Sequence, residues 1–206
     1  MEDMYNYTKT IALRAKEAKR SVRRLSTTAK NLVLSELAEE LIIDTDEILD
    51  ANKKDIEDGK KKNLSPALLD RLLLDKKRIR ALSNSVLEIV SLPDPIGEAV
   101  RGMTLPNGIE LITKRVPLGV ILVIYESRPN VTIDVGALSF KSGNVCILRG
   151  GSEAFHTNKI LINIFAKVLL KNNISENAVV FVDNTDRSVI VPLLKMKNEI
   201  DIVVPR

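Results

Sequence analysis

From residue 116 onward, short apolar segments typical of strands alternate with segments that have the periodicity of helices. This alternation constrains the fold of the chain most strongly. Residues 116–124 form an almost continuous apolar run, as expected for a strand covered on both faces. Strands that alternate with helices through short turns imply right-handed crossovers and a parallel sheet. The sequence therefore predicts a Rossmann-like parallel sheet with helices on both faces. Further strands are predicted at 145–148, 178–182 and 200–204, with helices at 131–142, 154–171 and 187–196.

The chain before this series is predicted to be helical. Apolar residues in the first 95 positions recur every three or four places, the spacing of amphipathic helices. Ser26, Ser65 and Asp75 are predicted to cap helices, and Gly59 to close one or two helical turns. We expect a helical layer without a polar site. Its apolar positions are predicted to include Ile11, Ala15, Ala18, Val22, Leu32, Leu37, Leu41, Leu68, Leu69, Leu72, Leu73, Ile79, Leu82, Val86 and Ile89.

A predicted β-hairpin separates the helices from the parallel sheet. Apolar residues alternate on either side of Asn107 and Gly108, and an Asn-Gly pair tolerates the positive φ angles of a tight turn. We predict an N-terminal helical region over 1–95, the hairpin over 96–115 and a Rossmann-like domain over 116–206. The last predicted strand has no following helix to cover its far side, so we expect this domain to be truncated at its C-terminus.

Charge and cysteine content argue against several classes of protein. The net charge is +4, and the basic stretches at 9–30 and 53–62 are interleaved with acidic or apolar residues and lack stacking aromatics. Solvated helix faces are therefore favoured over a nucleic-acid interface. The single cysteine allows no internal disulfide, and neither a signal peptide nor an apolar membrane span is recognisable. These features predict a cytoplasmic protein that binds neither nucleic acid nor membranes.

The first candidate site segment follows the predicted strand 116–124. Parallel sheets bind ligands at the carboxyl ends of their strands, and this end carries Ser127, Arg128, Pro129 and Asn130. The Asn130 amide suits an oxyanion, because it donates hydrogen bonds without carrying a titrating charge. The alternative is that Asn130 merely caps the next helix.

The second candidate segment comprises Arg149, Gly150, Gly151, Ser152 and Glu153. The glycines would let a phosphate or ribose approach the backbone, and Ser152 is predicted to cap a helix whose free amides can bind an anion. Glu153 either accepts hydrogen bonds from ribose hydroxyls or simply complements the helix dipole. The pattern is not the dinucleotide fingerprint G-x-G-x-x-G, but its position after a buried strand favours a cofactor role.

The remaining reactive residues favour structural roles. The polar turn at 183–186 is predicted to cap the next helix. Cys146 lies within a predicted buried strand, where a thiol behaves as a small hydrophobe rather than a nucleophile. His156 is predicted at a solvated helix surface. With one cysteine and one histidine, no metal site of standard spacing can be assembled.

Several strings resemble the γ-glutamyl phosphate reductases, also called glutamate-5-semialdehyde dehydrogenases, a family of the aldehyde dehydrogenase superfamily. The resemblance covers nearly the whole chain, and ESRPN and LRGGSEA are specific to the family. It implies an α/β, aldehyde-dehydrogenase-like fold in which N-terminal helices and a β-hairpin precede a Rossmann-like sheet. The strings are LDRLLLD at 69–75, LPDPIG at 92–97, VPLGV at 116–120, YESRPNVT at 125–132, KSGN at 141–144 and LRGGSEA at 148–154.

The resemblance implies NADPH-dependent reduction of L-glutamyl 5-phosphate to L-glutamate 5-semialdehyde with release of phosphate, a step of proline biosynthesis. In the family a cysteine attacks the acyl phosphate, and the resulting thioester accepts hydride. Asn130 matches the oxyanion-hole amide, and 127–129 match the loop beside the cofactor. Residues 149–153 match the segment that holds its adenosine ribose, and Arg149 suits a 2′-phosphate. The full-length form is expected to be a homo-oligomer.

This chain departs from the family pattern at its C-terminal end. In the family, the nucleophilic cysteine lies well beyond the position of Arg206, so we predict an inactive fragment. The alternative is a non-catalytic homologue that acts as a binding or assembly module, favoured by the open strand edge after Val204. A CoA-acylating or ordinary aldehyde dehydrogenase is disfavoured, because those relatives differ at the ESRPN and RGGSEA positions.

Overall fold

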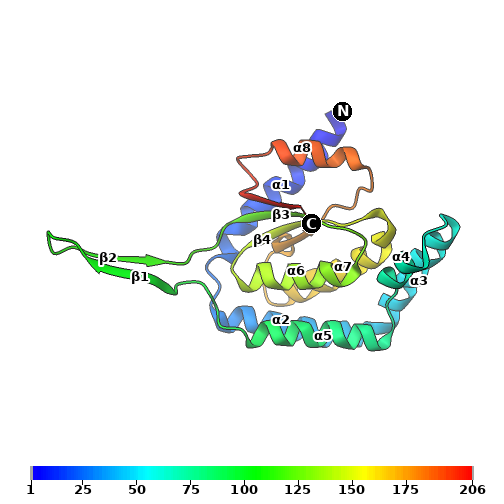
Figure 1. The fold of residues 1–206 in the computed structure, drawn as a ribbon, viewed down its shortest axis with the longest axis horizontal. Helices are drawn as coiled ribbons and strands as arrows, with labels where there is room; N and C mark the ends of the chain where they lie inside the picture. The colour runs from blue at the N-terminus through cyan, green and yellow to red at the C-terminus, as the bar shows by residue number, and fades with distance from the viewer. Residues whose placement is uncertain (1, 206) are drawn as a thin grey trace.

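The computed structural model describes residues 2–205, in which helices pack in layers about a four-stranded sheet (Figure 1). Helices α1 and α8 cover one face of the sheet, and α6 and α7 cover the other. Beyond α6 and α7 lies a layer of α2 and α5, with α3 and α4 at one end. The helices are α1 (Glu2–Val22), α2 (Thr27–Ile43), α3 (Thr45–Lys61), α4 (Pro66–Leu72), α5 (Lys76–Ser91), α6 (Pro129–Lys141), α7 (Phe155–Lys171) and α8 (Ile190–Lys195).

The sheet is parallel throughout and has the strand order β5-β4-β3-β6. This is the order of a doubly wound nucleotide-binding sheet, in which the chain starts centrally and the winding reverses between β3 and β6. The predicted α/β class and parallel sheet are confirmed. The strands are β3 (Val120–Ile124), β4 (Val145–Arg149), β5 (Val179–Phe181) and β6 (Ile202–Pro205).

The first strand of the sheet begins later than predicted. Val116 and Leu118 precede it and are 71% and 58% exposed. Gly119 has a φ of 127°, and a Cβ at this position would collide with the Asp201 carboxylate. That carboxylate accepts a hydrogen bond from Val120 N at 2.8 Å. Only glycine suits this close approach, so the chain enters the sheet at Val120.

Three predicted helix caps are confirmed. The side chains of Ser26, Ser65 and Asp75 accept hydrogen bonds from the backbone amides three positions on. Not every predicted apolar position faces the core, since Leu32 and Leu68 are 52% and 42% exposed. Leu37, Leu41 and Leu72 of the same predicted stripes are fully buried, as predicted.

The prediction that Gly59 closes a short helix is wrong. Helix α3 runs on to Lys61, and Asn63 supplies the positive φ, at 55°. Gly59 is buried inside the helix, where a Cβ would lie 3.0 Å from both Leu64 Cδ1 and Leu69 Cδ2. The glycine therefore allows the segment leading into α4 to pack closely on α3.

Helix α1 packs directly against the sheet. Ala12 and Ala15 are fully buried, and one hydrophobic cluster runs through the N-terminal helices and the strands. Because this cluster joins the helices to the sheet, the predicted division of the chain into a helical region, a hairpin and a nucleotide-binding domain stays a prediction. Within the described residues, none of the helices has both the length and the hydropathy needed to span a membrane.

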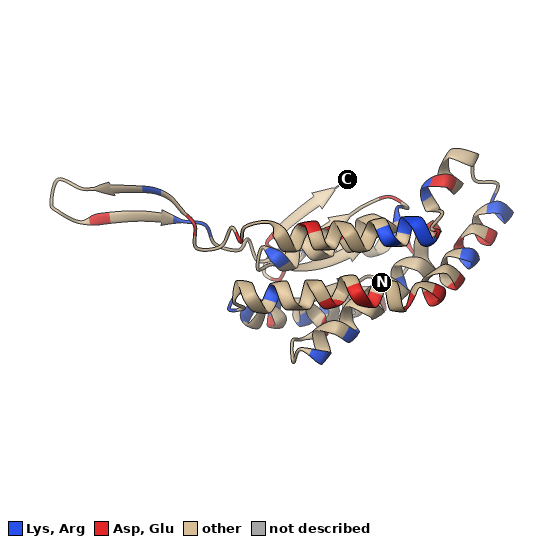
Figure 2. Cartoon of the chain, turned by 90° about the horizontal axis from the view of Figure 1, so that it is seen from below, with Lys and Arg blue, Asp and Glu red and all other residues tan. Residues whose placement is uncertain are grey.

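The predicted hairpin is present and projects away from the layered body (Figure 1). Strands β1 (Ala99–Thr104) and β2 (Glu110–Lys114) pair antiparallel, and Gly108 in the turn has a φ of 85°. Every residue of both strands is exposed. Figure 2 shows few charged residues on the hairpin, whereas α3 carries both signs, as a solvated helix face does.

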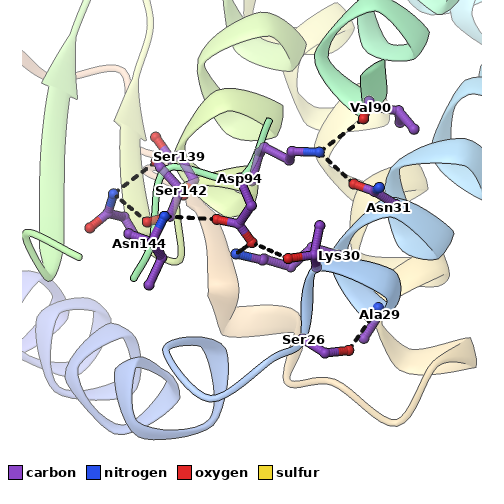
Figure 3. A network of polar contacts seen from close by, with 12 residues as sticks. Ser26, Ala29, Lys30, Asn31, Val90, Asp94, Ser139, Ser142 and Asn144 are labelled. Carbon is purple, nitrogen blue, oxygen red and sulfur yellow. Dashed lines mark hydrogen bonds and ion pairs between the residues drawn. The ribbon is translucent and has the colours of Figure 1, made fainter. Parts of the chain in front are cut away.

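Buried charges overturn the prediction of a helical layer without a polar site. Lys30 on α2 is 2% exposed, and its Nζ lies 2.5 Å from Asp94 Oδ2 (Figure 3). Lys141 at the end of α6 is also buried and donates to Asn31 Oδ1 at 2.5 Å and Val90 O at 2.9 Å. This cluster joins α2, α5 and α6.

The pKa values of Asp94 and Lys141 in this cluster are both shifted, and each shift has a physical cause. Burial raises the Asp94 pKa, but hydrogen bonds from Lys30, Thr27 and the Ile96 amide outweigh it, so the pKa lies below its usual range. Burial lowers the pKa of Lys141; attraction to Asp94 opposes this shift, and repulsion from Lys30 adds to it. Asp94 is thus stabilised as the anion that neutralises this buried corner.

We predict that Lys30→Met lowers the free energy of unfolding by about 3 kcal/mol near neutral pH, because it leaves a buried carboxylate without its partner. Lys141→Met is the matched control and should cost about 1 kcal/mol, since only neutral acceptors lose a donor. Urea denaturation measures both values.

The ion pair between Lys30 and Asp94 also predicts that the free energy of unfolding depends on pH. A carboxyl whose folded pKa is depressed contributes stability above its unfolded pKa of about 3.9 and loses it as the pH falls through the folded value. The difference between wild type and Lys30→Met should therefore shrink when unfolding is repeated near pH 3. An undiminished difference would contradict the assigned ion pair.

Candidate functional site

The carboxyl ends of β3 and β4 lie side by side. Ile124 is the register partner of Arg149, and Tyr125 N donates to Arg149 O at 3.1 Å. The turns that leave these strands therefore start from the same edge of the sheet, next to the reversal between β3 and β6 where doubly wound sheets bind ligands.

The two predicted site segments contact each other directly. Ser127 Oγ donates a hydrogen bond to Glu153 Oε2. A Cβ on Gly151 would collide with Ser127 Oγ, so the glycine is what allows the turns to approach. Burial raises the Glu153 pKa, but hydrogen bonds from Ser127 and Ser152 outweigh it and the pKa is lowered. Glu153 is accordingly an anion with acceptor capacity at the meeting point of the turns.

Arg149 links neighbouring turns of the backbone. Its guanidinium is buried and donates to Gly150 O at 2.7 Å and to Thr185 O at 3.0 Å. Burial lowers its pKa, and Arg187 lowers it further. Its buried Nε has no hydrogen-bond partner among the described residues. Two of its five N–H donors are thus already used within the protein.

Two amides at the start of α7 are not free, while the predicted anion site directly after Ser152 stays a prediction. Asp55 on α3 accepts from His156 N at 3.0 Å and from Thr157 N at 2.7 Å. The predicted cap Ser152 begins a short 3-10 turn, Ser152–Ala154, and makes no side-chain cap bond to α7. A carboxylate from α3 therefore already occupies the anion-binding amides of His156 and Thr157.

Two cavities flank the meeting point of the turns. The strand-end pocket has a volume of about 360 Å³ and is lined by Ser127, Arg149, Gly151 and Glu153, together with Arg71, Arg187 and neighbouring apolar residues. The α5–α6 pocket has a volume of about 410 Å³ and contains Arg128 and Asn130. Arg71 lines both. The structure thus places six of the nine predicted site residues in two adjoining compartments, while Ser152 lines a third pocket beside His156.

Asn130 does not cap α6. It lies in the first turn of the helix, after Pro129, and Arg128 occupies the N-cap position without a side-chain cap bond. Its Nδ2 donates to Asp134 Oδ2 at 3.3 Å, and the side chain is exposed within the α5–α6 pocket. The alternative that Asn130 caps the helix is therefore wrong, and its amide lies beside Asp134 in the lining of the pocket.

The structural roles predicted elsewhere are confirmed. Asn184 Oδ1 accepts from Asp186 N at 2.9 Å, and Asp186 caps the next turn through Ser188 N at 2.8 Å. Cys146 is fully buried, and burial raises its thiol pKa to about 12. His156 is exposed on α7.

Sequence patterns missed several residues that line these pockets. Arg71 belongs to a recognised string, but nothing in its spacing indicated that it reaches both pockets. Asp134 follows Asn130 by one helical turn, which is the only local signal for their contact. Asp55 lies 101 residues from His156, and no local pattern could have paired them.

Several known proteins are similar to this chain in sequence. Gamma-glutamyl phosphate reductases from Leptospira interrogans (strain 56601) and Clostridium tetani are 60% and 44% identical to this chain, matching 97% and 100% of it and 48% of each relative. The chain thus spans about half the length of these curated relatives. No protein-family model matches it.

Comparison with solved structures leads to the same enzyme. The gamma-glutamyl phosphate reductases of Thermotoga maritima and Saccharomyces cerevisiae superpose with TM-scores of 0.94 and 0.89 at 36% and 29% identity, each over 97% of this chain and 48% and 51% of the other. A probable aldehyde dehydrogenase from Listeria monocytogenes has a TM-score of 0.74 at 13% identity, over 98% and 41%, and shows the shared fold alone.

The chain is therefore homologous to the gamma-glutamyl phosphate reductases over about half of their length, and its fold is aldehyde-dehydrogenase-like.

Proposed function

We propose that this chain supplies the cofactor crevice and the oxyanion amide for NADPH-dependent reduction of L-glutamyl 5-phosphate to L-glutamate 5-semialdehyde with release of phosphate. This is the step of proline biosynthesis that the resemblance implies, and it fits a cytoplasmic enzyme. The observation that carries the proposal is the hydrogen bond between Ser127 and Glu153, which joins the two site turns at the switch point of the sheet.

The strand-end pocket fits the adenosine part of a dinucleotide. Its volume of about 360 Å³ lies in the range of small-molecule sites. Glu153 would accept hydrogen bonds from ribose hydroxyls, and the unpartnered Nε of Arg149 offers one further donor. Arg187, exposed at the rim, can meet a 2′-phosphate more readily than the buried Arg149 guanidinium. When bound, the nicotinamide would supply the hydride.

Asn130 is suited to stabilise the developing oxyanion. Its amide lies in the first turn of α6, where the helix dipole also favours negative charge. An amide donor does not titrate, so its contribution would persist across the working pH range. Ser127, Arg128 and Pro129 would hold this turn in place, with Arg128 Nε 2.8 Å from Glu126 Oε1.

The nucleophile must come from outside residues 1–206. Cys146 is the only cysteine of the sequence, and it is fully buried with a raised thiol pKa. A thiolate attacking an acyl phosphate needs exposure and a lowered pKa. The chain by itself would bind ligands without turning them over.

A second candidate function is that of an assembly module. The hairpin exposes Val100, Met103, Leu111 and Ile112, which an isolated two-stranded arm leaves unpaired in water. Association through this arm is the route by which the whole enzyme would form a homo-oligomer. Light scattering after size-exclusion chromatography tests it, and a stable monomer argues against the module.

We predict that the chain binds NADPH and that Glu153→Ala weakens binding by about tenfold, the cost of losing a charge-assisted hydrogen bond. Glu176→Ala, which removes an exposed glutamate of a different turn, is the matched control and should bind as wild type does. Quenching or enhancement of NADPH fluorescence gives both dissociation constants. Equal affinities for the two variants would contradict the assigned ribose contact.

We further predict that the chain alone reduces no acyl phosphate and that Cys146→Ala changes neither this result nor NADPH binding. A thiol reagent should label Cys146 only after denaturant is added, because the folded protein buries it. Rapid labelling of the native chain, or turnover that is lost in the variant, would show that Cys146 is reactive after all.

A further inference from the structure

The α5–α6 pocket carries charges of both signs beside Asn130. Asp70, Arg71 and Arg78 reach it from α4 and α5, while Arg128 and Asp134 reach it from the start of α6. Its volume of about 410 Å³ exceeds what a small amino acid needs. What this pocket can bind depends on which of these charges the protein already neutralises.

Most of the charged groups are paired within the protein. Arg78 Nη2 lies 2.6 Å from Asp70 Oδ1, and Arg78 Nη1 donates to Leu73 O at 2.8 Å. Arg128 Nε lies 2.8 Å from Glu126 Oε1. Asp70 and Arg78 hold a wall of the pocket and have little remaining capacity for a ligand, whereas the Arg128 guanidinium is paired with Glu126 alone and keeps unused donors among the described residues.

Two further charges, of opposite sign, are also available. Asp134 accepts only from neutral donors, Ser85 Oγ at 2.8 Å and Asn130 Nδ2 at 3.3 Å, and forms no ion pair among the described residues. Arg71 has one loose pairing, with its Nη1 3.6 Å from Glu126 Oε2, and half of its side chain is exposed. A carboxylate without a cation and a loosely held guanidinium therefore line the same cavity.

We propose that the α5–α6 pocket binds the α-amino acid end of the substrate, with Asp134 taking the ammonium group and Arg71 the carboxylate. A guanidinium binds a carboxylate in a planar, bidentate manner, and an ammonium donates strongly to an ionised carboxyl. The proposal rests on the proposed function, because it requires a glutamyl substrate. It also makes Asp134 and Arg71 residues that determine specificity.

The position of Asp134 fits the position of the acyl group. Asp134 and Asn130 are one helical turn apart and share a hydrogen bond. In a glutamyl substrate, four bonds separate the ammonium nitrogen from the γ-acyl carbon. A bound ammonium could replace Asn130 as the donor to Asp134, which would leave the Asn130 amide for the acyl oxygen. Ser85 would hold the Asp134 carboxylate in place.

The test is an NMR titration of the 206-residue chain with three probes. L-Glutamate stands in for the substrate, glutarate lacks the ammonium group and 4-aminobutyrate lacks the α-carboxylate. We expect L-glutamate to bind about tenfold or more tightly than either, since each comparison removes a charge-assisted contact. The shifted amides should include those near Asn130 and Asp134.

Variants separate the two contacts. Asp134→Asn should abolish the preference for L-glutamate over glutarate, and Arg71→Gln the preference over 4-aminobutyrate. Asp70→Asn is the matched control, because this carboxylate lines the same pocket but is already paired with Arg78, and it should keep both preferences.

Several results would overturn the proposal. Equal binding of all three probes, binding of none, or an unchanged preference in Asp134→Asn would each do so. NADPH is titrated into the same samples to locate the failure. Retained NADPH binding would confine the failure to the amino acid pocket, whereas loss of both would also refute the proposed function.

Discussion

The parallel pairing of β3 with β4 is the constraint on which the rest of the site depends. It brings Ile124 opposite Arg149, so that the turns leaving both strands begin at one edge of the sheet. Glycine at position 151 then lets the second turn contact Ser127. Two compartments form around this contact, one suited to a nucleotide and one suited to a charged small molecule.

Pairing within the protein decides which charged residues are available to ligands. Arg149 belongs to a predicted cofactor segment, yet its guanidinium donates to two backbone carbonyls, and Asp55 of α3 likewise accepts from backbone amides of α7. Asp134 and Arg71 lack such partners or hold them loosely. Because a buried polar group must be satisfied, the strongest donors and acceptors of a site are often used to build it. The residues left over are those that we propose to determine its specificity.

Local patterns predicted the features that local physics determines. The apolar run near Val120, the Asn-Gly turn and the caps at Ser65 and Asp75 each act over a few residues, and the structure contains them. Long-range contacts were beyond such patterns. The contact of Asp55 with α7 and the packing beneath Gly59 depend on elements that meet only in the folded chain.

Hydrogen–deuterium exchange with and without NADPH tests most directly whether the two site turns form one binding edge. We predict that the backbone amides of residues 125–130 and 149–153 become protected from exchange together, at the same NADPH concentration, while exchange in the hairpin β1–β2 is unchanged. Protection of only one turn, or protection centred on the hairpin, would contradict it.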